Sequence, residues 1–188
     1  MDIFGKGYIT LHEFLCGLEK FDLHPSKMDA SLLLKYFDRG QDGRLDLKEF
    51  TLMMCPFQRE YVRILKSRKG QQPGSCLDYD ELFSSATVNY IQKAFRSLLE
   101  NAVAVESLRQ RISNKIGIEP HLVFEQLDMD KDGKISSKDL EVLFKNSKID
   151  INADQVDFIV KRFDHNHDSK IGKVEFIKEF QPWSKFAY

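Results

Sequence analysis

The sequence predicts an all-α protein of two lobes, each a pair of helix–loop–helix units, joined by a long helical connector. Two observations support this fold class. Windows of twelve residues rich in Asp and Gly begin at residues 2, 38, 128 and 164, with 36 residues between the starts in each pair. Between the pairs, apolar residues recur at helical spacing. Because repeats of this size bury a core by pairing with a neighbour, each pair should form one lobe. The expected divisions are an N-terminal pair at 1–55, a connector at 56–118 and a C-terminal pair at 119–188.

Composition restricts the class of protein. With 188 residues the chain is long enough for two small domains, and its net charge of -1 gives no sign of a nucleic-acid partner. We find no apolar run of about 18 residues, no signal peptide and no N-terminal Gly for myristoylation, so we expect no membrane anchor. Cys16, Cys55 and Cys76 follow no metal-ligand spacing. We therefore expect free thiols and a cytoplasmic location.

The alternation of residue types within each window indicates its chemistry. In a tight loop, the side chains at positions 1, 3, 5, 9 and 12 and the backbone carbonyl at position 7 converge on one point. Such a set suits Ca2+, a hard cation that takes six to eight oxygen ligands. Gly at position 6 permits the sharp turn, and the apolar residue at position 8 contacts the partner loop. The ligand set of each window therefore predicts whether it binds the ion.

The first window, residues 2–13, has lost two ligands. Asp2, Gly7 and Glu13 keep positions 1, 6 and 12, but Phe4 and Lys6 occupy positions 3 and 5. An ammonium at an inward position repels a cation, so we expect a structural loop that binds no Ca2+. A helix over residues 10–20 should follow. The window leaves no room for an entering helix, so we expect either a piece of a longer protein or a partner that covers the exposed face.

The second window, residues 38–49, follows a helix that should begin near Ser26. Position 3 is Gly40, which offers no side-chain oxygen, so a water would have to take its place. We expect weaker Ca2+ binding here. The predicted ligands are Asp38, Asp42, the carbonyl of Arg44, Asp46 and Glu49.

Two features stand out in the connector. Residues 70–81 keep an apolar residue at position 8 and Glu81 at position 12 but lack the first three ligands. They are either a vestigial window of the same kind or an ordinary Gly/Pro loop. Residues 88–116 form an amphipathic helix of roughly 40 Å, broken at most once. Its apolar stripe includes Phe95 and Leu108, with Glu106 and Arg109 among the intervening polar residues. The helix could pack between the lobes, serve as a strut or lie in a lobe's groove as a built-in target.

The C-terminal windows, residues 128–139 and 164–175, have the fullest ligand sets. We expect both to bind Ca2+ with a Kd of about 10^-7 to 10^-5 M or weaker, and Ile135 and Ile171 at position 8 to pair in an antiparallel bridge. The predicted ligands are Asp128, Asp130, Asp132, Lys134, Ser136 and Asp139 in the first loop and Asp164, Asn166, Asp168, Lys170 and Glu175 in the second.

Each of these two windows has one defect. Asp139 is one methylene shorter than Glu at position 12, so it should reach the ion less well and shift the preference towards Mg2+. Ser169 replaces Gly at position 6, which costs about 1 kcal/mol if its φ is positive. His165 and His167, at positions 2 and 4, should point outward into solvent.

Windows 38–49, 128–139 and 164–175 with their helices resemble the EF-hand superfamily, the calmodulin-like proteins in particular, and window 2–13 extends the resemblance. It implies Ca2+ as cofactor and a protein partner, such as a target helix bound by a Ca2+-opened groove. The long connector is more similar to EF-hand proteins of ciliates and other protists, several linked to cilia and the cell cortex. That similarity implies an alternative, a structural component of the cytoskeleton or axoneme whose hands serve as scaffold. We find no catalytic pair, phosphate loop or zinc spacing, so we do not expect an enzyme.

Overall fold

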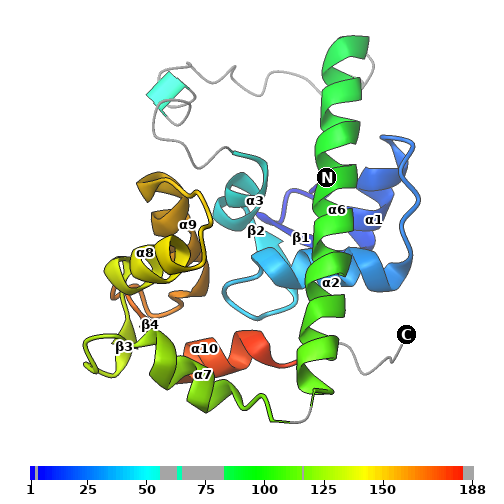
Figure 1. The fold of residues 1–188 in the computed structure, drawn as a ribbon. Coiled ribbons are helices and arrows are strands. Elements are labelled where there is room, and N and C mark those ends of the chain that lie inside the picture. The colour runs from blue at the N-terminus through cyan, green and yellow to red at the C-terminus, as the bar shows by residue number, and fades with distance from the viewer. Residues whose placement is uncertain (3, 56–62, 65–82, 116, 184–188) are drawn as a thin grey trace. The chain divides into compact units, whose positions relative to one another are not determined.

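The computed structural model describes residues 1–188 apart from 3, 56–62, 65–82, 116 and 184–188 (Figure 1). The described part is predominantly helical, which confirms the predicted all-α class with a hand pair on either side of a long helix. Its residues fall into two compact units, which meet in sequence within that helix: residues up to Val105 belong to the first and those from Glu106 onward to the second.

The N-terminal unit holds the first two windows. Its strands are antiparallel, with Ile9 opposite Leu45, and both side chains are buried. This short bridge joins the two windows into one lobe. In chain order the elements are β1 (Tyr8–Thr10), α1 (Leu11–Glu19), α2 (Lys27–Phe37), β2 (Arg44–Asp46), α3 (Leu47–Met54) and the larger part of α6 (Ser85–Ser113).

The helix starts in this unit follow from their capping residues. Thr10 and Asp46 are the N-caps of α1 and α3, and each forms a reciprocal capping box with the Glu three residues later. Ser26 caps α2 by accepting the backbone N–H of Asp29, as predicted. Since window positions 9 and 12 are also the N-cap and third helical residue, the loop and the helix that follows it are fixed by the same side chains.

Helix α6 completes the core of the N-terminal unit. Phe95 is 1% exposed, and its ring lies 6.1 Å from that of Phe14 and 6.0 Å from that of Phe21. The side-chain amide of Gln92 donates to the carbonyl of Phe21 at 2.8 Å. Burying a Phe contributes about 1.5–3 kcal/mol, so this half of α6 is an integral part of the lobe.

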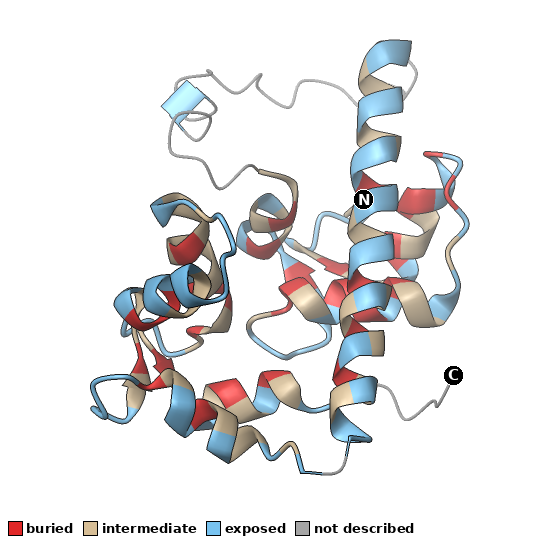
Figure 2. Cartoon of the chain, viewed as in Figure 1, coloured by how far each residue is buried: buried red, intermediate tan, exposed pale blue. Residues whose placement is uncertain are grey.

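The C-terminal unit holds the last two windows. Ile135 lies opposite Ile171 in an antiparallel pair and both are buried, which confirms the predicted bridge. Phe124 and Phe176, whose ring centroids are 5.6 Å apart in an edge-on contact, belong to the same core as this bridge. Figure 2 colours the buried residues of the chain red. The elements are the end of α6, α7 (Pro120–Leu127), β3 (Lys134–Ile135), α8 (Ser137–Asn146), α9 (Ala153–Phe163), β4 (Ile171–Gly172) and α10 (Lys173–Phe180).

The long helix is confirmed, but it spans Ser85–Ser113 instead of 88–116 and its faces need one correction. It runs unbroken for 29 residues, about 43 Å. The apolar stripe holds at Phe95 but is wrong near the C-terminal end, where Leu108 is 54% exposed while Glu106 and Arg109 are 1% and 7% exposed. The physical reason is that partner charges from the C-terminal unit meet these two side chains, which periodicity alone does not reveal.

Cys16 and Cys55 are free thiols, as expected. The suggested vestigial hand at 70–81, with Cys76, lies outside the described residues, as does Ile116 of the predicted stripe. None of the helices that the structure describes combines the length and apolar content needed to cross a bilayer.

Candidate metal centre

The four windows share one loop conformation. In each, the Asp at position 1 accepts the backbone N–H groups of positions 5 and 6, at 2.7–3.2 Å. The residue at position 6 has a positive φ in every case, including Ser169 at +66°. The sharp turn therefore persists without Gly in the last loop, at a strain of about 1 kcal/mol. Over the described residues, the windows therefore share this turn and differ in their ligands.

Loop 128–139 brings three carboxylates together. Oxygen atoms of Asp128, Asp130 and Asp132 all lie within 4.8 Å of one another. Asp130 accepts the N–H of Asp132 at 3.2 Å, and Asp132 accepts that of Lys134 at 2.9 Å, so backbone groups fix the direction of these side chains. A converging set of hard oxygens on a tight turn fits Ca2+. The bound ion would supply the positive charge that offsets the repulsion among the three carboxylates.

Position 12 shows the effect of side-chain length. In loop 164–175, one oxygen of Glu175 accepts the N–H groups of both His165 and Asn166, at 2.9 and 3.1 Å. In loop 128–139, the corresponding oxygen of Asp139 accepts the N–H of Met129 at 3.2 Å, while its other oxygen binds the N–H and hydroxyl of Ser136. The shorter side chain crosses less of the loop, in line with its predicted weaker reach.

The first three ligand positions of loop 164–175 make the same backbone contacts as those of loop 128–139. Asp164 and Asn166 both accept the N–H of Asp168, at 3.1 and 2.9 Å, and Asp168 accepts that of Lys170 at 3.0 Å. Position 9 is Gly172, which has no side-chain ligand. A carboxylate, an amide, a second carboxylate and a long Glu175 therefore face one turn.

Two reciprocal ion pairs join the C-terminal loops. Lys134 Nζ binds Asp168 Oδ2 at 2.6 Å, and Lys170 Nζ binds Asp132 Oδ2. These hydrogen bonds from the ammonium groups are the main reason why the pKa values of Asp132 and Asp168 are lowered, and the same contact raises the pKa of Lys170. Sequence reasoning assigned only the carbonyls of the two lysines. The signal that could have found the pairs is Lys at position 7 of both loops.

Loop 38–49 holds its predicted ligands around position 3, where Gly40 has no side chain. Glu49 accepts the N–H groups of Arg39 and Gly40 at 2.7 and 3.0 Å, and Asp42 accepts that of Arg44 at 3.0 Å. A Cβ on Gly40 would have as its nearest neighbours carboxylate oxygens at 3.8 and 3.9 Å. This space, bounded by acceptors, suits the water proposed for position 3. The side chain of Asp46 accepts the N–H of Glu49 at 2.8 Å as the N-cap of α3.

Loop 2–13 carries its own cation. Lys6 Nζ lies 3.0 Å from Glu13 Oε2, and the rings of Phe4 and Tyr8 have their centroids 5.3 and 4.8 Å from this ammonium. Glu13 is 2% exposed. Its pKa is lowered to about 2 by the hydroxyl and the N–H of Thr10 and then by Lys6. The absence of Ca2+ binding here stays a prediction, and the ammonium at position 5 is its physical basis.

The prediction for His165 was wrong. His167 is exposed, but the side chain of His165 is only 20% exposed, with Nε2 3.6 Å from Glu179 Oε1. Position 2 of this loop faces the end of α10, where Glu179 is buried among charged groups. The outward direction that the loop pattern implies is therefore overridden by a tertiary contact.

Glu179 is the centre of this buried cluster. Arg109 donates to its carbonyl at 2.7 Å and to its carboxylate at 2.9 Å, and Arg162 lies 3.8 Å from the carboxylate. Burial is the main cause of the lowered pKa of Arg109, and the charge of Glu179 opposes it. Glu106 accepts the N–H of Trp183 at 3.0 Å. The cluster joins α6, α9 and α10 within the C-terminal unit.

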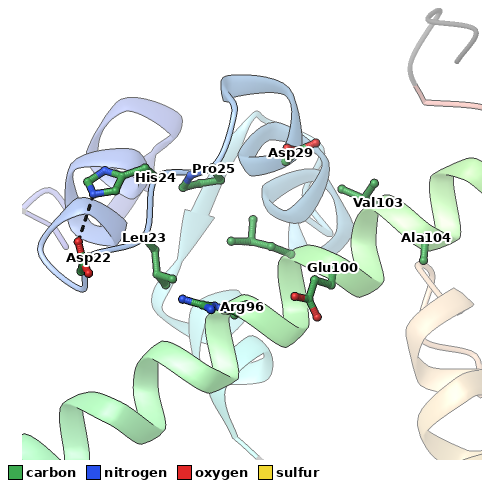
Figure 3. Close-up of a pocket in the computed structure, with 10 residues that line it drawn as sticks. Asp22, Leu23, His24, Pro25, Asp29, Arg96, Glu100, Val103 and Ala104 are labelled. Atoms are coloured by element: carbon green, nitrogen blue, oxygen red, sulfur yellow. Dashed lines mark hydrogen bonds and ion pairs between the residues drawn. The ribbon is translucent and has the colours of Figure 1, made fainter.

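A hollow of about 560 Å³ lies in the N-terminal unit, between α6 and the connection from α1 to α2 (Figure 3). Leu23 and Val103 contribute apolar surface, and Arg96 and Glu100 contribute opposite charges. At its rim Asp22 pairs with His24 at 3.4 Å. The residues that line the hollow lie outside the four loops and carry charges of both signs, so the hollow is not one of the metal sites.

Comparison with known proteins agrees with the loops. Family models described as an EF-hand domain pair match residues 121–181 and residues 5–54. The chain is also 24% identical, over 151 residues, to calcium-dependent protein kinase 32 of Arabidopsis thaliana. That match covers 77% of this chain and 23% of the relative, so the chain spans less than a quarter of the kinase's length.

Residues 121–181 contain both C-terminal loops, and residues 5–54 contain loop 38–49 and most of loop 2–13. Ca2+ is the ion that such loops bind. The chain is a member of the EF-hand calcium-binding superfamily.

Proposed function

We propose that the C-terminal unit is the main Ca2+ site and that the chain acts by binding, without catalysis. The observation that carries this proposal is the convergence of Asp128, Asp130 and Asp132 within 4.8 Å. The adjoining loop adds a second ligand set, closed by Glu175. Loop 38–49, with Gly40 at position 3, would be the weaker third site.

Calorimetric titration of the whole chain with Ca2+ tests this assignment. We expect two tighter sites and one weaker site, with Mg2+ competing best at loop 128–139 because Asp139 is short. Asp130→Asn should weaken one of the two tighter sites about tenfold or more, since it removes a carboxylate charge from the ligand set. Asp150→Asn is the matched control, because Asp150 is an exposed carboxylate of the same unit outside the loops. No heat at millimolar Ca2+ would overturn the proposal.

We further propose that the chain is a Ca2+ sensor with a protein partner. Support comes from the buried contact of Arg109 with Glu179, because α10 begins within loop 164–175 and ends at that contact. A movement of α10 on Ca2+ binding would therefore reach α6 directly. Such a movement would expose apolar surface for a target helix. A hydrophobic dye whose fluorescence rises with Ca2+ would support the sensor.

The alternative is a structural component of the cytoskeleton or axoneme, located in the cytoplasm or cilium. Contacts in the N-terminal unit favour it, because the Lys6–Glu13 pair and the buried Phe95 hold that lobe without a metal ion. Dye fluorescence indifferent to Ca2+, together with sedimentation in the cytoskeletal fraction at both high and low Ca2+, would select this alternative. Release of the chain from that fraction by Ca2+ would select the sensor.

A further inference from the structure

The two lysines at position 7 of the C-terminal loops point across to the neighbouring loop. Lys134 belongs to loop 128–139, yet its ammonium binds Asp168, the position-5 residue of the other loop, at 2.6 Å. Lys170 makes the reciprocal contact with Asp132. Each lysine therefore has two roles, because its carbonyl is a predicted ligand of its own loop while its ammonium pairs with a predicted ligand of the other.

The antiparallel bridge explains why the exchange is reciprocal. Lys134 lies opposite Gly172, next to the pair formed by Ile135 and Ile171. The two position-7 residues thus flank the bridge at equivalent places. One oxygen of each position-5 carboxylate accepts the N–H of its own loop's position 7, at 2.9 and 3.0 Å, and the other oxygen is left for the ammonium of the opposite loop.

Resting on the function proposed above, we propose that these lysines are crossed competitors of Ca2+, so that each loop's affinity is limited by the lysine of the other loop. A dication bound by Asp132 or Asp168 would share that carboxylate with an ammonium. The two positive charges repel at this short range. Binding therefore requires the ammonium to weaken or leave its contact, which lowers affinity.

The crossed arrangement gives a signature that a general charge effect does not. Lys134→Gln should tighten Ca2+ binding at loop 164–175, and Lys170→Gln should tighten it at loop 128–139. Each change should lower the Kd of the opposite loop about two- to fivefold, the range expected of one exposed ion pair. A general net-charge effect would instead act about equally on both loops.

Nuclear magnetic resonance titration of the whole ¹⁵N-labelled chain resolves the two sites. The amides of Gly133 and Ser169, each bound to the position-1 carboxylate of its own loop at 2.8 Å, report the two loops separately. Lys131→Gln is the matched control, since it removes the same charge from an exposed position of loop 128–139. Lys134→Arg keeps the ion pair and should behave as the unmodified chain does.

The expected result is a lowered Kd at Ser169 for Lys134→Gln and at Gly133 for Lys170→Gln, with differences that shrink at high ionic strength. Equal effects at both amides, effects no larger than those of Lys131→Gln, or weaker binding in the lysine variants would overturn the inference alone. No shift of either amide at millimolar Ca2+ in the unmodified chain would overturn the proposed function and this inference with it.

Discussion

Lys6, through its contact with Glu13, shows how one residue alters the charge within a loop. The turn of loop 2–13 matches that of the other three, since Asp2 accepts the N–H groups of positions 5 and 6 at 3.0 and 2.7 Å. What differs is that a positive charge comes from the chain itself, in contact with the position-12 carboxylate. A loop pattern therefore predicts a backbone shape more reliably than it predicts an ion.

The N-terminal unit should lose stability in acid through Glu13. The pKa of Glu13 is lowered from 4.5 to about 2 in the folded chain, so the unfolded chain takes up the proton first as the pH falls. The stabilisation is complete above about pH 4.5 and disappears as the pH falls towards 2. Urea unfolding followed by circular dichroism should show this loss. Glu13→Gln should be less stable at pH 6 with a flatter pH dependence, and an unchanged slope would contradict the assignment.

Loop 2–13 should become a Ca2+ site when its two defects are corrected. Phe4→Asp combined with Lys6→Asp would restore carboxylates at positions 3 and 5 around a turn that is already formed. The amide of Gly7, bound to Asp2 at 2.7 Å, should then shift on titration with Ca2+. Phe4→Asp alone is the control, because it leaves the ammonium in place and should give no shift. Equal binding by both variants would show that Lys6 does not exclude the ion.

At the scale of elements, Arg109 fixes the end of α6 to α10. Arg109→Met should destabilise the C-terminal unit by about 3–5 kcal/mol, because it removes a paired cation from beside the buried carboxylates of Glu106 and Glu179. Arg111→Met, at an exposed position two residues further along the same helix, should change stability by about 0.5 kcal/mol or less. Chemical denaturation followed by tryptophan fluorescence measures both. A small effect of Arg109→Met would mean that apolar packing holds α6.

Phe95 should be equally important for the N-terminal unit. Removing a ring that is 1% exposed leaves a cavity beside Phe14 and Phe21, so Phe95→Ala should cost about 3–5 kcal/mol. Tyr90→Ala, which removes a ring that is 73% exposed on the same helix, should cost little. Thermal unfolding followed by circular dichroism compares them. Similar losses in the two variants would argue that α6 is not part of this core.

The Arg109 contact also marks the limit of what the sequence could predict, whereas the burial of Phe95 was predicted. The period of 36 residues and the spacing of apolar residues were sufficient for the loops, the bridge between Ile135 and Ile171, and the long helix α6, although they left one break in that helix open. The direction of long charged side chains was not accessible, because Lys134, Arg109 and His165 bind groups that are distant in sequence. Periodicity places a residue on a face, but a buried charge depends on a partner that only the tertiary fold supplies.

At the scale of the whole molecule, the division of residues into two units predicts two unfolding transitions with different responses to Ca2+. Trp183 is the single tryptophan, and the Arg109 guanidinium lies 3.8 Å from its ring centroid, so its fluorescence reports the C-terminal unit. Ca2+ at a hundred times the Kd stabilises by about 2.7 kcal/mol for one site. For a unit of this size, that raises Tm by about 10–20 °C.

Circular dichroism, which reports helices of both units, should then resolve into one transition that follows the fluorescence and one that moves much less. The second should belong to the N-terminal unit, where Lys6 occupies position 5 of one loop and Gly40 occupies position 3 of the other. Mg2+ at the same concentration is the control, and it should shift the fluorescence transition less. Equal shifts of both transitions would mean that both lobes bind Ca2+ with similar affinity. A fluorescence transition that does not respond to Ca2+ would mean that the C-terminal lobe is not the main Ca2+ site.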